Sequence, residues 1–289
     1  MTLQKTMRAM VTMGHGDLDQ MVMHEDWPCP TSAPDEVLIR VGACGLNNTD
    51  VNTRSGWYSK TVTDATTGGA FEDVGQDDPT WGGAPITFPR IQGADVCGEI
   101  IAVGKNVDPA RIGERVITDG WLRDANDPED MNKTGYFGCE RDGGFAEYTT
   151  TPSRNALAVR SDLSDAELAT FSCSYSTAEG MLTRAKVCAD DTVLVPGASG
   201  GVGGALVQLA KRRGARVIAM ASEAKHKDIA GLGADVILPR APDTLRAALA
   251  DENVTVVADV VGGPYWPTLI DVLERGGRYT CSGAIAGPM

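Results

Sequence analysis

A glycine-rich turn is the stretch of this sequence whose residue types point most directly to chemistry. Residues 197–203 read GASGGVG, after the β-branched run 192–195 and before apolar residues at helical spacing. Residues without a Cβ let the backbone approach a pyrophosphate, and a helix starting there offers free N–H groups and its positive dipole end. The pattern predicts a strand, turn and helix that bind a dinucleotide. The predicted cofactor-binding residues of the turn are Ala198, Ser199, Gly200, Gly201, Val202 and Gly203.

The turn departs from the strict dinucleotide fingerprint. The first position of G-x-G-x-x-G falls on Ala198, while Gly200 and Gly203 occupy the other two. A glycine cluster alone is equally compatible with an ordinary tight turn. The strand before it and the helix after it favour the nucleotide interpretation.

The end of the next strand, predicted at 216–221, bears on which nucleotide binds. NAD sites usually place an acid there, on the ribose 2′-hydroxyl. The expected position is Ala221, and it is followed by Ser222 and Lys225, a hydroxyl and a cation that suit a 2′-phosphate. We therefore predict NADP(H), bound by Ser222 and Lys225. Glu223 favours the alternative, because it becomes the NAD-binding acid if the strand runs two residues longer.

Two domains are needed to position these residues. Short strands alternating with turns predict a small antiparallel β-domain of barrel type in 1–158. Strands alternating with helices predict a doubly wound parallel sheet of Rossmann type in 159–289, whose first helix is capped by Ser161 or Ser164. The segment 59–89, rich in Thr, Gly, Asp and Pro, predicts a long loop insertion, and 123–142 is also loop-like.

Composition excludes several classes of partner. The 289 residues carry a net charge of −13, which disfavours nucleic acid and anionic membranes. No apolar run reaches the length of a membrane helix, and the N-terminus lacks the apolar region of a secretory signal. The 7 cysteines include no C-x-x-C, a pattern typical of reduced thiols and not of a disulfide framework or a four-cysteine zinc lobe. We expect a cytoplasmic protein with a small-molecule substrate.

Several motifs, in order along the chain, resemble the medium-chain dehydrogenase/reductase superfamily, above all its zinc-independent quinone oxidoreductase branch. They are CGLNNTDVNTRSGWY at 44–58, GADVCGEIIAVGKNV at 93–107, SYSTAEGML at 174–182, the glycine-rich turn, and DVVGG at 259–263. The resemblance implies a GroES-like β-domain packed on a Rossmann domain, with the active site in the cleft between them. It adds Thr177 and Val261 to the cofactor-binding residues, although a threonine near a helix start is also an ordinary structural feature.

The zinc ligands of the alcohol dehydrogenases in this superfamily are missing. The resemblance implies a cysteine, a histidine and a third ligand, and the matching positions here are Asn47, Ala94 and Cys173. Neither an amide nor a methyl group replaces a thiolate or an imidazole on zinc. We therefore predict no metal. The alternative is an alcohol dehydrogenase with a non-standard zinc site built from Asp50, Asp95 and Cys173.

Asn47 and Tyr58 are the candidate catalytic residues, because the resemblance places both near the nicotinamide. Hydride addition to a quinone or an α,β-unsaturated carbonyl moves negative charge onto oxygen, and a hydrogen-bond donor there lowers the barrier. Tyr58 or solvent supplies the proton. In the competing structural interpretation Asn47 ties down a loop and Tyr58 packs beside Trp57.

The chain ends at Met289, where by the resemblance the fifth Rossmann strand has just finished. Relatives continue with a strand that commonly pairs across a dimer interface. We therefore expect a shortened natural form or a fragment, with a weakened homodimer. A nucleotide-binding structural or sensing protein without turnover is the alternative from another function class.

Overall fold

A computed structural model describes residues 4–59, 62, 65, 85–240 and 245–287. These residues form two compact units, one within Met1–Val62 and Gly69–Cys173 and the other within Thr63–Gly68 and Ser174–Met289. Most of the predicted insertion 59–89 lies outside the described residues.

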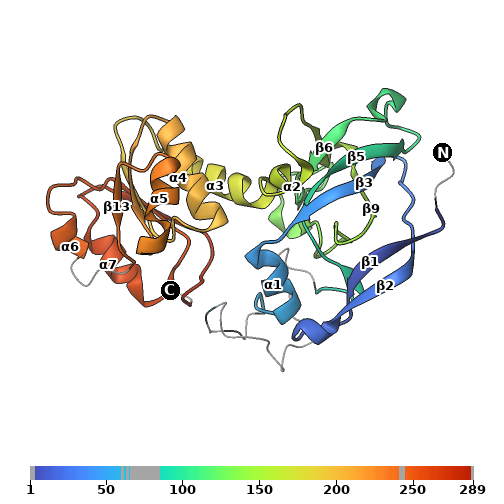
Figure 1. The fold of residues 1–289 in the computed structure, drawn as a ribbon, viewed down its shortest axis with the longest axis horizontal. Coiled ribbons are helices and arrows are strands. Elements are labelled where there is room, and N and C mark those ends of the chain that lie inside the picture. Colours follow the sequence, from blue (N-terminus) through green and yellow to red (C-terminus); the bar gives the residue numbers. More distant parts are fainter. Residues whose placement is uncertain (1–3, 60–61, 63–64, 66–84, 241–244, 288–289) are drawn as a thin grey trace. The chain divides into compact units, whose positions relative to one another are not determined.

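The first unit consists of antiparallel strands, which confirms the predicted β-domain (Figure 1). One sheet has the order β2-β1-β4 and another the order β10-β6-β5-β3-β9. Strand β8 lies inside the stretch 123–142 that was predicted as loop-like, and it pairs with β7, which lies just before that stretch. Buried Ile39, Ile100 and Val116, from three neighbouring strands, pack in one core cluster. The strands are β1 (Thr6–Thr12), β2 (Met21–Pro28), β3 (Glu36–Gly45), β4 (Arg90–Ile91), β5 (Asp95–Val103), β6 (Arg115–Thr118), β7 (Trp121–Leu122), β8 (Gly135–Tyr136), β9 (Tyr148–Pro152) and β10 (Ala156–Ala158).

Two residues separate the end of β3 from helix α1 (Asn48–Ser55), and the second of them, Asn47, is the N-cap of the helix. It ends at Gly56, whose φ of 72° is a left-handed conformation that a residue without a Cβ adopts readily. Arg54 donates a hydrogen bond of 2.6 Å to the carbonyl oxygen of Gly16, which ties the helix to the loop after β1. Arg54 therefore has a structural role, and the helix holds Asn47 in place.

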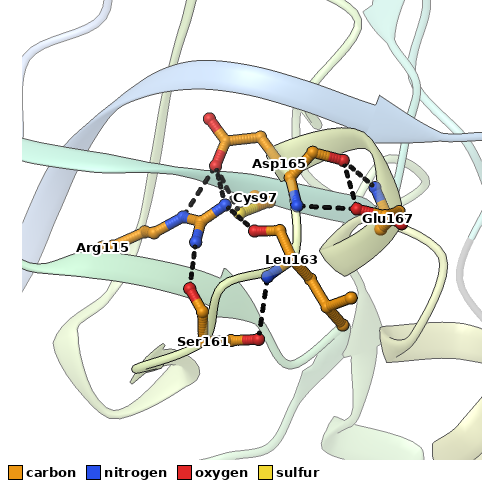
Figure 2. A network of polar contacts seen from close by, with 7 residues as sticks. Cys97, Arg115, Ser161, Leu163, Asp165 and Glu167 are labelled. Atoms are coloured by element: carbon orange, nitrogen blue, oxygen red, sulfur yellow. Dashed lines mark hydrogen bonds and ion pairs between the residues drawn. The ribbon is translucent and has the colours of Figure 1, made fainter.

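Arg115 of β6 fixes the segment that follows the β-domain, as Figure 2 shows. Its guanidinium donates to Asp165 Oδ1 at 2.7 Å and to the carbonyl oxygens of Ser161 and Leu163 at 3.0 and 2.7 Å. The Cys97 thiol lies 3.4 Å from the same Asp165 oxygen. Burial, together with the Asp165 carboxylate, raises the pKa of Cys97 to about 11, so this thiol is protonated and has a structural role.

Helix α2 (Asp165–Leu168) is capped by Ser164, one of the two predicted N-caps. Ser164 and Glu167 form a capping box, in which the Ser164 hydroxyl accepts the Glu167 N–H at 3.2 Å. The helix packs on β3 and β5, and Leu168 is buried against Cys97. These contacts hold residues 159–173 in the first unit, whereas the sequence assigns them to the nucleotide domain.

The second unit is a parallel sheet with the order β13-β12-β11-β14-β15, and every paired strand is parallel. The strands are β11 (Thr192–Val195), β12 (Arg216–Met220), β13 (Val236–Leu238), β14 (Val256–Asp259) and β15 (Arg278–Cys281). The helices are α3 (Ser172–Arg184), α4 (Gly201–Arg212), α5 (His226–Gly231), α6 (Leu245–Ala248) and α7 (Trp266–Asp271). Chain order reverses between β11 and β14, which makes this point the switch point of the sheet.

Core residues cover both faces of this sheet. Val193 and Leu206 belong to one cluster, and Leu194 and Leu269 belong to the other. Because alternate residues of β11 enter different clusters, the sheet is doubly wound, as predicted. Short 3-10 helices lie at Leu18–Gln20, Pro109–Arg111, Met131–Lys133, Ser153–Asn155, Glu223–Lys225 and Gly263–Tyr265. No helix among the described residues has the length and apolar character required to cross a membrane.

Candidate functional site

Asn47 and two buried carboxyl groups form a hydrogen-bonded cluster in the first unit, which we call the Asn47 cluster (Asn47, Asp50 and Asp95). Asp50 accepts the backbone N–H of Asn47 at 2.8 Å and that of Gly93 at 3.2 Å. Asp95 Oδ2 accepts the side-chain amide of Asn47, and its Oδ1 accepts the backbone N–H of Cys173. All four carboxyl oxygens therefore face protein donors, and Asn47 is held by Asp50 through its backbone N–H and by Asp95 through its side-chain amide.

Burial raises the pKa of both carboxyl groups in the Asn47 cluster. The pKa of Asp50 rises to about 7, chiefly through burial, which outweighs the hydrogen bond from Asn47 and is reinforced by the charge of Asp95. The pKa of Asp95 rises to about 6, again through burial, against the hydrogen bonds from Cys173 and Asn47. Burial and the two acids also raise the pKa of the Cys44 thiol well above its usual value. The cluster therefore changes its charge near neutral pH.

Tyr58, the second predicted catalytic residue, donates a hydrogen bond from its hydroxyl to Thr49 Oγ1 at 3.0 Å. Burial raises the pKa of Tyr58 to about 12, so the phenol is neutral at physiological pH and acts as a donor. Cys173 and Cys139 lie close enough to contribute to that rise.

Tyr136 of β8 is a site residue that the sequence analysis missed. Its hydroxyl is hydrogen bonded to the Cys173 thiol, and burial is the largest cause of its raised pKa. Asp95 and Tyr58 contribute as well, which places this ring beside the Asn47 cluster. The residue comes from a polar stretch that was predicted as a loop, and nothing in that stretch signals an inward-facing phenol.

The acids of the alternative zinc site are held by hydrogen-bond donors of the protein. The oxygens of Asp50 and Asp95, the acids of the alternative zinc site, accept hydrogen bonds from backbone and amide N–H groups. Within the described ranges, no group of three or more His, Cys, Asp or Glu side chains is arranged to hold a metal ion. Zinc prefers four ligands from such side chains in structural sites and three plus water in catalytic ones.

In the second unit, the glycines of the turn serve different purposes. Gly197 has a φ of 68°, and a Cβ at Gly203 would lie 2.1 Å from the Gly197 carbonyl oxygen. Gly203 therefore permits close packing of α4 on the turn, the purpose of the third glycine in a dinucleotide fingerprint. A Cβ added to Gly200 would meet one atom of the described residues within 4 Å, the Gly197 carbonyl oxygen at 3.6 Å. Gly200 is thus the position at which the backbone is open to a ligand.

Helix α4 begins without a side-chain cap. Its N-cap, Gly200, is extended, with φ −82° and ψ 170°, and the first turn holds no acidic residue. The first N–H groups of a helix have no intrahelical acceptor, so here they are oriented for an anion that the helix dipole also favours. The arrangement fits the pyrophosphate of a dinucleotide.

The side chains of several predicted residues of the turn point into the protein. Ala198 is buried in the core, and its N–H donates to the carbonyl oxygen of Met220 at 3.1 Å. Val202 packs against the same core cluster, while Ser199 is half-buried. The side chains of Ala198 and Val202 therefore belong to the core, and the N–H of Ala198 already has an acceptor within the protein.

Strand β12 ends at Met220, so Ala221 lies directly after the strand, as expected. Glu223 lies in the following 3-10 helix, whose N-cap position is Ser222, and not in the strand. Lys225 is exposed, with Nζ 3.5 Å from Asp228 Oδ2. Such an exposed pair is weak, so it holds the Lys225 ammonium group only loosely.

Val261 and Thr177 lie near the turn. A Cβ on Gly197 would be 2.9 Å from Val261 Cγ2, so the loop after β14 contacts the glycine-rich turn. Thr177 is half-buried in α3, three residues after Ser174, whose Oγ would lie 2.6 Å from a Cβ on Gly201. The structure therefore brings α3, the turn and the loop after β14 together at the carboxyl edge of the sheet.

Comparison with known proteins finds matches to the residues of both units. Residues 33–161 match the family model of the alcohol dehydrogenase GroES-like domain, and 201–289 match that of the zinc-binding dehydrogenases. The crystal structure of a putative alcohol dehydrogenase from Sinorhizobium meliloti 1021 is 46% identical with a TM-score of 0.87, covering 99% of this chain and 78% of that one. The quinone oxidoreductase of Homo sapiens is 26% identical over 289 residues, 98% of this chain and 75% of that protein. The acryloyl-coenzyme A reductase of Metallosphaera sedula is 29% identical over 280 residues, 94% and 75% respectively.

A GroES-like domain together with a Rossmann-type domain defines the class of protein. The chain belongs to the medium-chain dehydrogenase/reductase superfamily. It is accordingly an oxidoreductase whose cofactor is a nicotinamide dinucleotide. The relatives bear the names of both alcohol dehydrogenases and reductases, so family membership alone does not select the substrate.

Proposed function

We propose that this protein is an NADPH-dependent reductase of quinones or α,β-unsaturated carbonyl compounds that works without zinc. The observation that carries the proposal is the Asn47 cluster. Where the alcohol dehydrogenases hold zinc ligands, this chain has an amide whose N–H is bound to Asp95 and acids whose oxygens accept protein N–H groups. A substrate that is already electron-poor needs no Lewis acid to accept hydride.

When bound, the reduced nicotinamide supplies a hydride to the β-carbon of the substrate. As that C–H bond forms, the electron pair of the C=C bond moves toward the carbonyl oxygen. We assign the Asn47 amide to a hydrogen bond with this oxygen, and the Tyr58 hydroxyl to a second one that replaces its bond to Thr49. Both stabilise the developing charge on the oxygen. The enolate then takes a proton at the α-carbon from Tyr58 or water, which yields the saturated carbonyl compound.

Asp95 and the raised pKa of Tyr58 support these roles. An amide nitrogen carries two N–H bonds, and the bond from Asn47 to Asp95 fixes the plane in which both lie. A pKa of about 12 keeps the Tyr58 phenol protonated, so it is a donor at every pH at which the enzyme works.

The preference for NADPH rests on the strand end at Met220. No acid stands at Ala221, and Ser222 and Lys225 follow within one short helical turn. A hydroxyl and an ammonium group complement a 2′-phosphate, whereas an NAD site requires an acid on the ribose hydroxyls.

The test is a titration of the purified protein with NADPH and with NADH, followed by nicotinamide fluorescence, with zinc measured on the same sample. We expect NADPH to bind at least about tenfold more tightly. We also expect no stoichiometric zinc, and NADPH oxidation with quinones or enones. Stoichiometric zinc together with alcohol oxidation would overturn the proposal.

An alcohol dehydrogenase is the second candidate, because the Sinorhizobium structure at 46% identity is described as a putative member of that class. Turnover of alcohols with NAD or NADP, abolished by chelation, would favour it. Cofactor binding without any substrate-dependent oxidation would instead favour a sensing protein.

A further inference from the structure

Asp259 and Tyr279 brace the loop that follows β14. Asp259, the last residue of that strand, is fully buried and accepts the N–H of Val261 at 2.8 Å and that of Gly262 at 3.2 Å. The Tyr279 hydroxyl donates to Asp259 Oδ2 at 2.6 Å. One buried carboxyl group thus receives three donors, two of them from the loop itself.

The Tyr279 ring and its hydroxyl have separate surroundings. In the parallel register Tyr279 of β15 lies opposite Val257, two residues before Asp259. Its ring packs against the core cluster that contains Leu194 and Leu269. The hydroxyl therefore reaches along the strand to the carboxyl edge of the sheet, while the ring is held by apolar contacts that a phenylalanine would keep.

The braced loop has an unusual backbone and lies against the glycine-rich turn. Gly262 and Gly263 have positive φ values of 63° and 71°, which residues with a Cβ rarely adopt. Glycine visits many other conformations at little cost, so such a loop needs restraint from outside. The Val261 side chain meets Gly197, and the Val261 carbonyl oxygen accepts the N–H of Ala286 at 2.9 Å.

We propose that Tyr279 is a positioning residue for the dinucleotide, acting through Asp259 to hold the Val261–Gly262 backbone beside the turn. The proposal rests on the nicotinamide binding proposed above. Ligands of open α/β sheets bind beyond the carboxyl ends of the strands at the switch point, which lies here between β11 and β14. A loop held in its binding conformation loses less conformational entropy when the ligand arrives, so the brace increases affinity.

Tyr279→Phe tests this, because it removes the hydroxyl and keeps the ring. We expect the Kd for NADPH to rise about tenfold, equivalent to about 1.4 kcal/mol. Hydrogen exchange without cofactor provides the second readout, since the Val261 and Gly262 amides should exchange faster while the strands do not. Activity is not needed for either measurement.

Thr255→Val is the matched control. Thr255 Oγ1 donates to Asp191 Oδ1 at 2.7 Å, so it too is a hydroxyl bound to a carboxyl group, at the opposite edge of the same sheet. We expect it to lower stability without changing the Kd or the exchange of Val261 and Gly262.

Two results would overturn the inference while leaving the proposed function intact. One is an unchanged Kd and unchanged exchange in the Tyr279→Phe variant. The other is an equal loss of affinity in both variants, which would reduce the role of Tyr279 to stability. Failure of the wild-type protein to bind NADPH or NADH would instead overturn the proposed function, and with it the assignment of Tyr279.

Discussion

The side-chain amide of Asn47 donates a hydrogen bond to Asp95, and Asp95 also accepts the backbone N–H of Cys173. One carboxyl group thereby joins the start of α1, the start of β5 and Cys173, where the first unit ends. Because Asp95 is fully buried, neither hydrogen bond is exchanged readily for water. The orientation of the Asn47 amide is therefore a property of the folded first unit.

Replacing Asp95 by Asn should lower catalysis and leave cofactor binding unchanged. An amide at 95 still accepts one N–H but directs its own N–H groups at the other donor, so Asn47 or the Cys173 backbone loses its partner. We expect kcat for enone reduction to fall at least about tenfold through misplacement of the Asn47 donor. The Kd for NADPH should stay the same, since the glycine-rich turn belongs to the second unit.

Glu99→Gln is the control for that variant. Glu99 lies on the same strand as Asp95 but is exposed, in an ion pair with Arg40 of 2.8 Å. Its loss should not change kcat. If Asp95→Asn keeps full activity, the assignment of Asn47 to the substrate oxygen fails.

The free energy of unfolding should fall as pH rises from about 5 to about 7. Asp50 and Asp95 have folded pKa values of about 7 and about 6, above the ordinary value of 3.8. In this window the folded protein binds more protons than the unfolded chain. Each pH unit therefore lowers the free energy of unfolding by up to about 1.4 kcal/mol per carboxyl group, until the folded pKa of that group is passed. The contribution of each protonated carboxyl group to stability is complete below its unfolded pKa and is lost as the pH rises through its folded pKa.

Urea denaturation at several pH values measures this effect. We expect a loss on the order of 3 to 4 kcal/mol across the window. The Asp50→Asn variant should show a flatter profile, because its side chain does not titrate. A wild-type stability that rises over the same range would contradict the raised pKa values.

Much of the fold could be predicted from sequence, because strand and helix signals are local. The β-branched run 192–195 is β11, and the predicted strand 216–221 is β12 with its last residue removed. Ser164 carries its own capping partner three residues later. Such signals lie within one element, so they survive without knowledge of the tertiary structure.

The candidate site was predictable only in part, because its contacts are long-range. Asp95 and Cys173 are 78 residues apart, and Tyr279 and Asp259 are 20 apart. No periodicity in the sequence indicates that residues so far apart along the chain are in contact. The resemblance placed Asn47, Asp95 and Cys173 in one region but did not reveal that they are hydrogen bonded to one another. Tyr136 carried no signal of either kind.

The Gly200→Ala and Gly203→Ala variants should separate binding from stability. A Cβ at Gly203 would lie 2.1 Å from a backbone oxygen, so this variant should lose about 3 kcal/mol of stability. Gly200 has an extended backbone, and a Cβ there would have no close neighbour among the described residues, so the fold should tolerate alanine. Its methyl group would stand where the pyrophosphate approaches, and affinity for NADPH should fall at least about tenfold. Thermal melts and nicotinamide fluorescence distinguish the two effects. Tight NADPH binding by the Gly200→Ala variant would show that the phosphates lie elsewhere.

The proposed preference for NADPH over NADH depends on Lys225. Its ammonium group is exposed and forms only a 3.5 Å pair with Asp228, so its removal should cost little stability. Lys225→Ala should weaken NADPH binding about tenfold, because a phosphate loses its cation, and leave NADH binding unchanged.

Lys227→Ala is the matched control, since Lys227 is also exposed but lies on α5, beyond the 3-10 helix that carries Lys225. The difference between the two variants should shrink at high salt, as expected of an interaction between exposed charges. If Lys225→Ala affects both nucleotides equally, the 2′-phosphate does not contact Lys225. If Glu223→Ala instead weakens NADH binding, Glu223 binds the ribose from outside the strand and the protein uses NAD.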